Sequence, residues 1–333
     1  MSDEKNRSLP WLQPGWRDTT AAWISKQLAA QGLTLAGPVE QPHVRPWSTV
    51  LSVPTRTGLL YFKAVAPVLG HEPALTAALA RWRPDCMPEV LAIHPTRGWL
   101  LMRDSGTPLR ALIRADGDLH RWHSVLPLFA QVQMELAGRL DELLALGALD
   151  RRLTVLPAEY ERLLADTDSF LLDQPDGLSR AAHQRLLALA PRFAAECQRL
   201  ADFGLPETLH HDDFHDANIF LRGERCTFTD WGESCAAHPF FTTVVMLRSA
   251  AHTLNLPASS PEVLALRDRY LEPWEQLAPR AALLEAFNLA QRLGMVCRAL
   301  TWHRVIISLD EPFRSENAEA VPGWMGEFLE VFG

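Results

Sequence analysis

The hydrophobic periodicity changes near Gly106 and divides the chain into two parts with different secondary structure. Before this point the apolar residues form short runs bounded by turn residues. These runs predict strands at 48–53, 59–65, 90–94 and 99–103. A helical period covers residues 71–82 between them, and another covers 16–31 with Asp18 or Thr19 as its N-cap. Residues 1–105 are therefore predicted to form a small lobe with an antiparallel sheet and a helix.

Residues 106–333 have mainly helical periods. Apolar residues recur at helical spacing over five segments, 120–147 with Gly147 as its C-cap, 157–172, 179–203, 260–276 and 280–307. A chain of 333 residues is long enough for two domains with buried cores. The predicted fold class is α+β, with a small mixed lobe at 1–105 and a larger, mainly helical lobe at 106–333.

One polar segment, residues 208–239, interrupts these helices. It contains His211-x-Asp213-x-His215-x-x-Asn218, then two short strand-like runs around a turn, and then Asp230-Trp231-Gly232. Functional residues concentrate on loops that a rigid scaffold holds in place. This segment is therefore the predicted site of the chemistry.

The residue types of the polar segment suit phosphoryl transfer from a nucleotide. Such a reaction needs a carboxylate that accepts the proton of the attacking hydroxyl, together with oxygen ligands for Mg²⁺. Asp213 can be the base, while Asn218 and Asp230 can be the neutral and the anionic metal ligand. Gly232 is expected to let the backbone turn after the triplet.

The H-x-D-x-H-x-x-N element followed by D-W-G resembles the aminoglycoside phosphotransferase and choline kinase-like group of small-molecule kinases. The resemblance implies a protein-kinase-like fold with two lobes and a hinge at about 101–105. It places a catalytic loop at 209–218, a metal-binding triplet at 230–232 and the acceptor site in the C-terminal lobe. It also implies ATP, with GTP not excluded, and Mg²⁺ as cofactors.

The resemblance assigns roles to individual residues. Asp213 is the implied catalytic base, and Asn218 and Asp230 the implied metal ligands. The implied nucleotide-binding residues are Lys63, its helix partner Glu72, the hinge residues Met102 and Asp104, and Ser48 beside the phosphate-covering loop. His211 and His215 would hold the catalytic loop by hydrogen bonds. Separately from the resemblance, Asp216, Trp231 and Glu233 are candidate acceptor contacts because they flank these residues.

Lysine usage supports the role of Lys63 independently of the resemblance. The chain has 29 Arg and only three Lys, and Lys63 is the one lysine beyond residue 26. A compact ammonium suits a position between phosphates and a carboxylate, which a planar guanidinium fits differently.

Three departures from the family pattern accompany this match. Asp212 replaces a usual glycine, the segment HVRPWST lacks glycine, and AHPFF replaces an acidic stretch after the triplet.

Charge and composition exclude several classes of function. The net charge is −8, which counts against nucleic acid as a partner. Residues 106–333 carry net −11, which would suit a cationic acceptor, although a solvated acidic surface is commoner. No apolar run could span a bilayer, and the polar N-terminus with five unpaired-looking cysteines favours the cytoplasm. The expected partner is a small molecule that bears a hydroxyl group.

Two other functions fit parts of the same segment. A pseudokinase would bind a nucleotide without turnover. A metal-dependent phosphohydrolase of the HD type would use the cluster His210, His211, Asp212, Asp213 and His215 as transition-metal ligands. That second alternative requires ligands from several helices, whereas this cluster lies on one loop.

Overall fold

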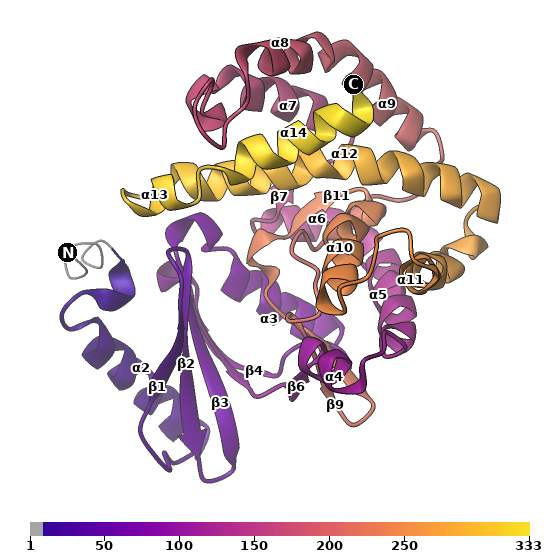
Figure 1. The fold of residues 1–333 in the computed structure, drawn as a ribbon. Coiled ribbons are helices and arrows are strands. Elements are labelled where there is room, and N and C mark those ends of the chain that lie inside the picture. Colours follow the sequence, from indigo (N-terminus) through magenta and orange to yellow (C-terminus); the bar gives the residue numbers. More distant parts are fainter. Residues whose placement is uncertain (1–8) are drawn as a thin grey trace. The chain divides into compact units, whose positions relative to one another are not determined.

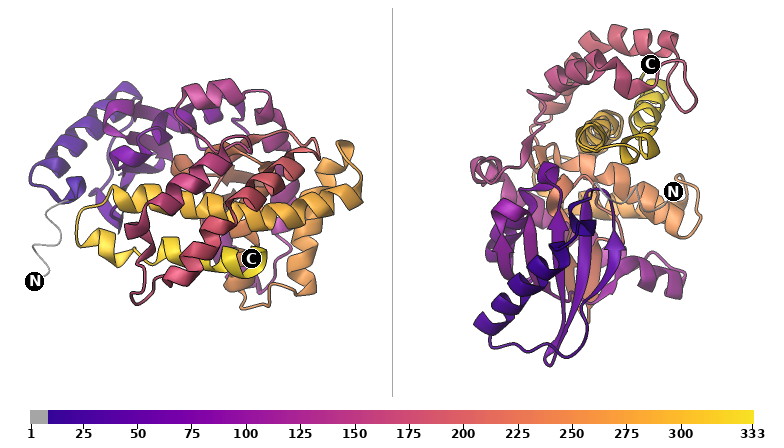
Figure 2. Two further views of the ribbon diagram at one scale, coloured as in Figure 1. Left: turned by 90° about the horizontal axis from the view of Figure 1, so that it is seen from above. Right: turned by 90° about the vertical axis from the view of Figure 1, so that its left-hand side faces the viewer.

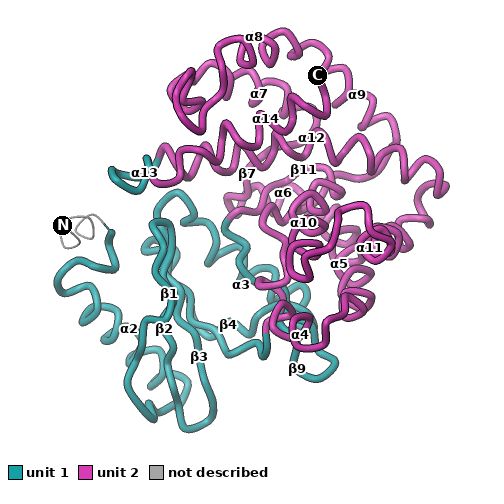
Figure 3. The backbone as a smooth tube through the Cα atoms, viewed as in Figure 1, with its two compact units in different colours: residues 1–107, 220–232, 308–315 teal, residues 108–219, 233–307, 316–333 magenta. Residues whose placement is uncertain are grey.

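The computed structural model describes residues 9–333, which form two compact units (Figure 3). Unit 1 contains the described residues up to Thr107 together with Phe220–Gly232 and Ser308–Ser315. Unit 2 contains Pro108–Ile219, Glu233–Ile307 and Glu316–Gly333. The units thus differ from a linear division at residue 105, because the triplet 230–232 lies in unit 1. The charged N-terminal stretch that favoured the cytoplasm falls mostly outside the described residues.

Unit 1 is built on a five-stranded antiparallel sheet (Figure 1). Its strand order is β1-β2-β3-β5-β4, with β1 Glu40–Val44, β2 Ser48–Thr55, β3 Gly58–Val65, β4 Val90–His94 and β5 Trp99–Arg103. The other regular elements are η2 Pro10–Leu12, α2 Trp16–Ala30, η3 Pro67–Leu69, α3 Glu72–Trp82, η4 Pro95–Arg97, β6 Thr107–Pro108, β9 Ile219–Arg222, β10 Arg225–Phe228, η6 Trp231–Glu233 and α13 Phe313–Glu316. The four predicted strands are present, and β1 is an additional edge strand.

The start of α2 corrects one detail of the sequence prediction. The N-cap residue is Gly15, which has a left-handed backbone with φ 79°, and neither Asp18 nor Thr19 occupies that position. Both residues lie inside the first turn, where the Thr19 hydroxyl donates to the Gly15 carbonyl. Asp18 there faces the positive end of the helix dipole, which is a favourable place for a carboxylate.

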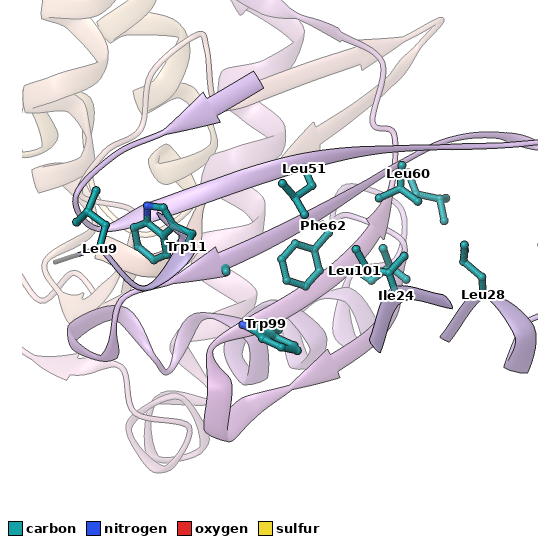
Figure 4. Packing of buried hydrophobic residues seen from close by; sticks show 11 residues of the cluster. Leu9, Trp11, Ile24, Leu28, Leu51, Leu60, Phe62, Trp99 and Leu101 are labelled. Carbon is teal, nitrogen blue, oxygen red and sulfur yellow. The ribbon is translucent and has the colours of Figure 1, made fainter. Parts of the chain in front are cut away.

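The core of unit 1 lies between the sheet and α2 (Figure 4). Phe62 of β3 is fully buried and packs edge-to-face against Trp99 of β5, with ring centroids 5.6 Å apart. Ile24 and Leu28 contribute from one face of α2. Each such side chain contributes about 1.5–3 kcal/mol by leaving water. This packing fixes β3 and therefore the strand position of Lys63.

Gly106 follows β5 and comes close to β9 within unit 1. Its φ is 110°, and a Cβ added there would lie 2.4 Å from the carbonyl oxygen of Leu221. We expect Gly106→Ala to destabilise the protein by about 2–4 kcal/mol, because both strain and a backbone clash oppose the alanine. Gly223→Ala is the matched control at φ 61° in open space, and it should cost about 1 kcal/mol. Urea unfolding measures both, and equal losses would contradict the clash.

Unit 2 is mainly helical and contains one small sheet. Its helices are α4 Leu109–Asp116, α5 Trp122–Ala137, α6 Leu140–Ala145, α7 Leu156–Ala165, η5 Thr167–Phe170, α8 Arg180–Ala188, α9 Ala190–Ala201, η7 Pro239–Thr242, α10 Thr243–Thr253, α11 Pro261–Leu271, η8 Glu272–Gln276, α12 Arg280–Ile307 and α14 Ala320–Phe332. The strands β7 Leu149–Asp150, β11 Cys235–Ala237 and β8 Thr208–His210 form a sheet in that order. Helix α14, which the periodicity did not predict, runs along α12 (Figures 1 and 2).

Two of the longer predicted helices of unit 2 are each split into two α-helices in the structure. The segment 120–147 forms α5 and α6, because Gly138 is a poor helix former and Arg139 leaves the helical region with φ −121°. The segment 179–203 breaks at Leu189, where Pro191 follows and cannot donate a hydrogen bond to the preceding turn. Among the described helices, none combines the length and apolar character needed to cross a membrane.

Candidate functional site

The catalytic loop of the prediction runs from the end of β8 to the start of β9. Within it, both carboxylate oxygens of Asp213 are engaged. Oδ1 accepts from Nη2 of Arg298 at 3.0 Å, and Oδ2 lies 3.2 Å from Nε2 of His215. The amide nitrogen of Asn218 donates to the Asp213 main-chain oxygen at 3.0 Å and lies 3.3 Å from Oδ2. The side-chain amide nitrogen of Asn218 thus faces Asp213, and the side-chain carbonyl oxygen of Asn218 points away from Asp213.

The charges around Asp213 keep it ionised. Burial opposes the charge, but the Arg298 guanidinium and then His215 outweigh it and hold the pKa of Asp213 well below its usual range. The side chain is nevertheless 25% exposed, which leaves part of the carboxylate accessible. Asp213 is therefore an ionised carboxylate that is held at both oxygens.

A buried ionic network lies beside the catalytic loop and explains the unusual Asp212. Its Oδ1 accepts from Nε2 of His210 at 2.8 Å, and Oδ2 faces the guanidinium groups of Arg151 at 3.8 Å and Arg298 at 3.6 Å. Burial opposes the charge of His210, but the bond to Asp212 outweighs it and raises the pKa of His210 to about 9. Where the family pattern has glycine, this chain thus has a carboxylate that connects β8 to α12.

The phosphate-binding lysine of the prediction lies in a second cluster, within unit 1. Lys63 Nζ donates to Glu72 Oε1 at 2.7 Å and to Asp230 Oδ1 at 2.6 Å. Lys63 and Glu72 are buried, while the side chain of Asp230 is 44% exposed. Burial works against the ammonium, but Asp230 and Glu72 outweigh it and hold the pKa of Lys63 above its usual range. Burial raises the pKa of Glu72 to about 7 despite the nearby ammonium.

The backbone of the triplet has two special features. Asp230 has φ 66°, a left-handed conformation that a non-glycine residue adopts at a cost and that occurs often at functional sites. Gly232 is required for space rather than for the turn that the sequence suggested. A Cβ at Gly232 would lie 2.9 Å from Oε2 of Glu72, and the Gly232 φ is not left-handed. A side chain here would push Glu72 away from Lys63.

The three candidate acceptor contacts have intramolecular partners. Asp216 is fully buried and bonds to Arg110 at 2.7 Å, Ser249 at 3.0 Å and Thr253 at 2.6 Å. Trp231 is buried and donates from Nε1 to the Phe228 carbonyl. These contacts engage the polar groups of Asp216 and Trp231 within the protein.

Glu233 has a different environment from Asp216 and Trp231. It is ion-paired with Arg298, and its side chain is 14% exposed. Burial raises the pKa of Glu233 to about 7, although the Arg298 charge opposes this. The guanidinium neutralises the carboxylate that was expected to meet a cationic acceptor. A cation at this position would have to compete with Arg298.

The predicted hinge and phosphate-covering residues lie on, or directly after, the interior strands β2 and β5 of the unit 1 sheet. Met102 is inside the ladder, opposite Tyr61 of β3 and Val90 of β4. The Asp104 N–H donates to the Leu59 carbonyl, and its own carbonyl accepts from Arg222, so a nucleotide base would have to use other backbone groups of 102–104. Ser48 closes the turn between β1 and β2, because its main-chain carbonyl accepts a hydrogen bond from the Arg45 N–H at 2.8 Å.

The two histidines that were expected to be structural lie within the catalytic loop. His211 is fully buried with its ring against Phe214, at a centroid distance of 5.7 Å. His215 accepts from the Ala217 N–H through Nδ1, while its Nε2 faces Asp213. His215 thus links the loop backbone to the carboxylate of Asp213.

Two arginines of this site, Arg151 and Arg298, were not predicted from the sequence. Arg151 follows β7 and bonds to the Cys297 carbonyl, and Arg298 lies within α12. Arg298 has one sequence signal, the apolar stretch Met295-Val296-Cys297 before it, whereas Arg151 stands between Asp150 and Arg152 and has no such signal. Such a charge is seldom buried unless it is paired, but its partners are far away in the sequence.

A buried histidine near this network predicts a pH dependence of stability. Burial, followed by the charge of His210, lowers the pKa of His238 from 6.5 to about 3. Because a depressed histidine pKa stabilises the fold above pH 6.5, this contribution is lost as the pH falls toward 3. We expect wild type to lose about 2 kcal/mol more than His238→Asn between pH 7.5 and pH 5. Urea unfolding at both pH values measures this, and parallel losses would contradict it.

No protein-family model and no curated protein match this chain, but solved structures do. It is similar to a choline/ethanolamine kinase family protein from Mesorhizobium loti, with 16% identity, a TM-score of 0.60 and coverage of 94% of each chain. It is also similar to the choline kinase LicA from Streptococcus pneumoniae, with 10% identity, a TM-score of 0.59 and coverage of 93% and 99%. A third is the macrolide 2′-phosphotransferase MphH from Brachybacterium faecium, with 16% identity, a TM-score of 0.55 and coverage of 90% and 97%. The chain therefore has the protein-kinase-like fold of these small-molecule phosphotransferases.

Proposed function

We propose that this protein is a kinase that transfers the γ-phosphoryl group of ATP to a hydroxyl group of a small molecule. The observation that carries the proposal is the Lys63 ammonium bound by both Glu72 and Asp230. A buried lysine held by two carboxylates, one of them half-exposed, is a ready partner for nucleotide phosphates. Together with the ionised Asp213, it supports phosphoryl transfer better than binding alone.

The reaction assigns one task to each group. The acceptor hydroxyl attacks the γ-phosphorus in line, its oxygen forms the new bond to phosphorus, and the bond to the β-phosphate oxygen breaks. Asp213 orients the hydroxyl and takes its proton late, after the new bond has begun to form. Lys63 holds the α- and β-phosphates, and Glu72 holds Lys63. Positioning and charge stabilisation supply most of the catalysis.

The oxygen ligands for Mg²⁺ would be Asn218 and Asp230. Amide and carboxylate oxygens are the hard donors that this ion prefers, and the Asn218 amide directs its nitrogen toward Asp213. When bound, Mg²⁺ would neutralise phosphate charge. Asp230 also accepts a hydrogen bond from Lys63, which would bring this metal ligand beside the ammonium that holds the phosphates.

Untargeted phosphorylation tests the proposal. Purified protein with Mg²⁺ and γ-labelled ATP is incubated with a small-molecule extract, and labelled products are identified by mass spectrometry. A product formed by wild type but not by Asp213→Ala supports the kinase and names the acceptor. A nucleotide-induced rise in melting temperature without any product would instead favour a pseudokinase. Tightly bound iron, manganese or zinc with phosphatase activity would favour the phosphohydrolase.

A further inference from the structure

Arg298 is a buried cation within α12, and only 7% of its side chain is exposed. Its guanidinium contacts three carboxylates of unit 2. Nη2 donates to Asp213 at 3.0 Å, Nη1 bonds to Glu233, and Nη1 also lies 3.6 Å from Asp212. The planar fork of an arginine can bond to two carboxylates at once, which a lysine ammonium does with less directional control.

Stability alone does not explain this arrangement. Burying charges costs several kcal/mol per ion before they interact, and apolar replacements of buried ion pairs are often neutral or stabilising. The residues around Arg298 in α12 are mostly buried and apolar, so apolar residues in place of the whole charged cluster would suit the helix. A charge kept at such a position points to a requirement other than folding, and its contact with Asp213 identifies the group it acts on.

The contacts of Asp213 divide between two sides. Arg298 holds Oδ1, while His215 and Asn218 lie at Oδ2. His215 and Asn218 belong to the same loop as Asp213 and move with it. Arg298 instead comes from α12 and is itself fixed by Glu233. Arg298 is therefore the contact that connects the Asp213 carboxylate to a long helix outside the catalytic loop.

We propose that Arg298 is a positioning residue for phosphoryl transfer, which holds the Asp213 carboxylate in the orientation needed to meet the acceptor hydroxyl. This rests on the proposed function. Glu233 then serves as the anchor of Arg298 rather than as a contact for a cationic acceptor. Loss of the Arg298 fork frees Asp213 to rotate, which lowers the fraction of bound substrate in a reactive geometry.

Steady-state kinetics with γ-labelled ATP and the acceptor found in the extract screen test the role. We expect Arg298→Gln to lower kcat roughly 30–100-fold, with KM for ATP and acceptor changed less than about threefold. Arg298→Lys should retain more activity than Arg298→Gln, and millimolar guanidinium should partly restore Arg298→Ala. Arg110→Gln is the matched control, since Arg110 bonds at 2.7 Å to Asp216 in the same loop without contacting Asp213.

The outcomes distinguish the positioning role from general loosening of the loop, and they test the Arg298–Asp213 pair separately from the proposed function. A similar loss of kcat in Arg110→Gln, or no restoration by guanidinium, would show general loosening of the loop and overturn the positioning role. Arg298→Gln leaves buried carboxylates without their cation. The double variant Arg298→Gln/Glu233→Gln also removes one of these negative charges, so its buried charge is closer to that of wild type. A double-mutant cycle of Arg298→Gln with Asp213→Asn, measured by urea midpoint without any ligand, should be non-additive. Additive shifts would overturn the pairing itself, whereas non-additive shifts with no transfer by wild type would count against the proposed function.

Discussion

Asp213→Asn is expected to lower kcat for phosphoryl transfer by roughly 10²–10⁴-fold, which is the usual contribution of a positioned general base. The amide keeps the size of the carboxylate but cannot accept the acceptor proton as readily. It also weakens the contact with Arg298, because the ionic attraction at 3.0 Å is lost. Binding of Mg²⁺ and ATP should change little, since the resemblance assigns the metal to Asn218 and Asp230.

Initial rates with labelled ATP and a nucleotide-induced melting shift measure the two effects separately. Asp118→Asn is the control, because its carboxylate is exposed and lies outside the catalytic loop. This variant should keep the wild-type rate. If Asp213→Asn kept more than a tenth of the wild-type kcat, Asp213 would not be the base. The proposed mechanism would then need another proton acceptor.

The second large effect is expected for Asp230→Asn, with a loss of roughly 10³-fold in transfer at saturating ATP. A metal ion that neutralises phosphate charge contributes several kcal/mol, and each 1.36 kcal/mol is tenfold in rate. Asparagine tolerates the left-handed backbone that Asp230 adopts at φ 66°, so the variant removes charge with little added strain. The loss therefore reports on the metal ligand and on the Lys63 pair, not on a misfolded turn.

A titration of Mg²⁺ against the transfer rate distinguishes these contributions. Asp230→Asn should require a much higher Mg²⁺ concentration for half-maximal rate, while the control Asp85→Asn, whose carboxylate is exposed in the same unit, should not. An unchanged Mg²⁺ dependence in Asp230→Asn would remove the metal role from Asp230. Its bond to Lys63 would then be the only function left for this carboxylate.

Short-range patterns of apolar and turn residues were sufficient to predict much of the fold. Strands 48–53, 59–65, 90–94 and 99–103 correspond to β2, β3, β4 and β5, because alternation and turn residues act over a few positions. The helix breaks at Gly138 and Leu189 were not predicted, since the apolar spacing continues across them. Strand β11 was also missed. Its pairing with β8 joins Cys235 to His210, and no local signal encodes such a partner.

For the site, the residue types and their order can be read from the chain alone: Lys63 on a strand, then Asp213 and Asn218 on one loop, then Asp230 after a hairpin. The spacing within 211–232 is local, so one sequence suffices to recognise it. Which charges pair with one another depends on how the chain folds. Arg298 and Asp213 are 85 positions apart, and Lys63 and Asp230 are 167 apart. Buried charges must be paired, but packing selects the partner, which is why Asp216 belongs to Arg110 and Glu233 to Arg298.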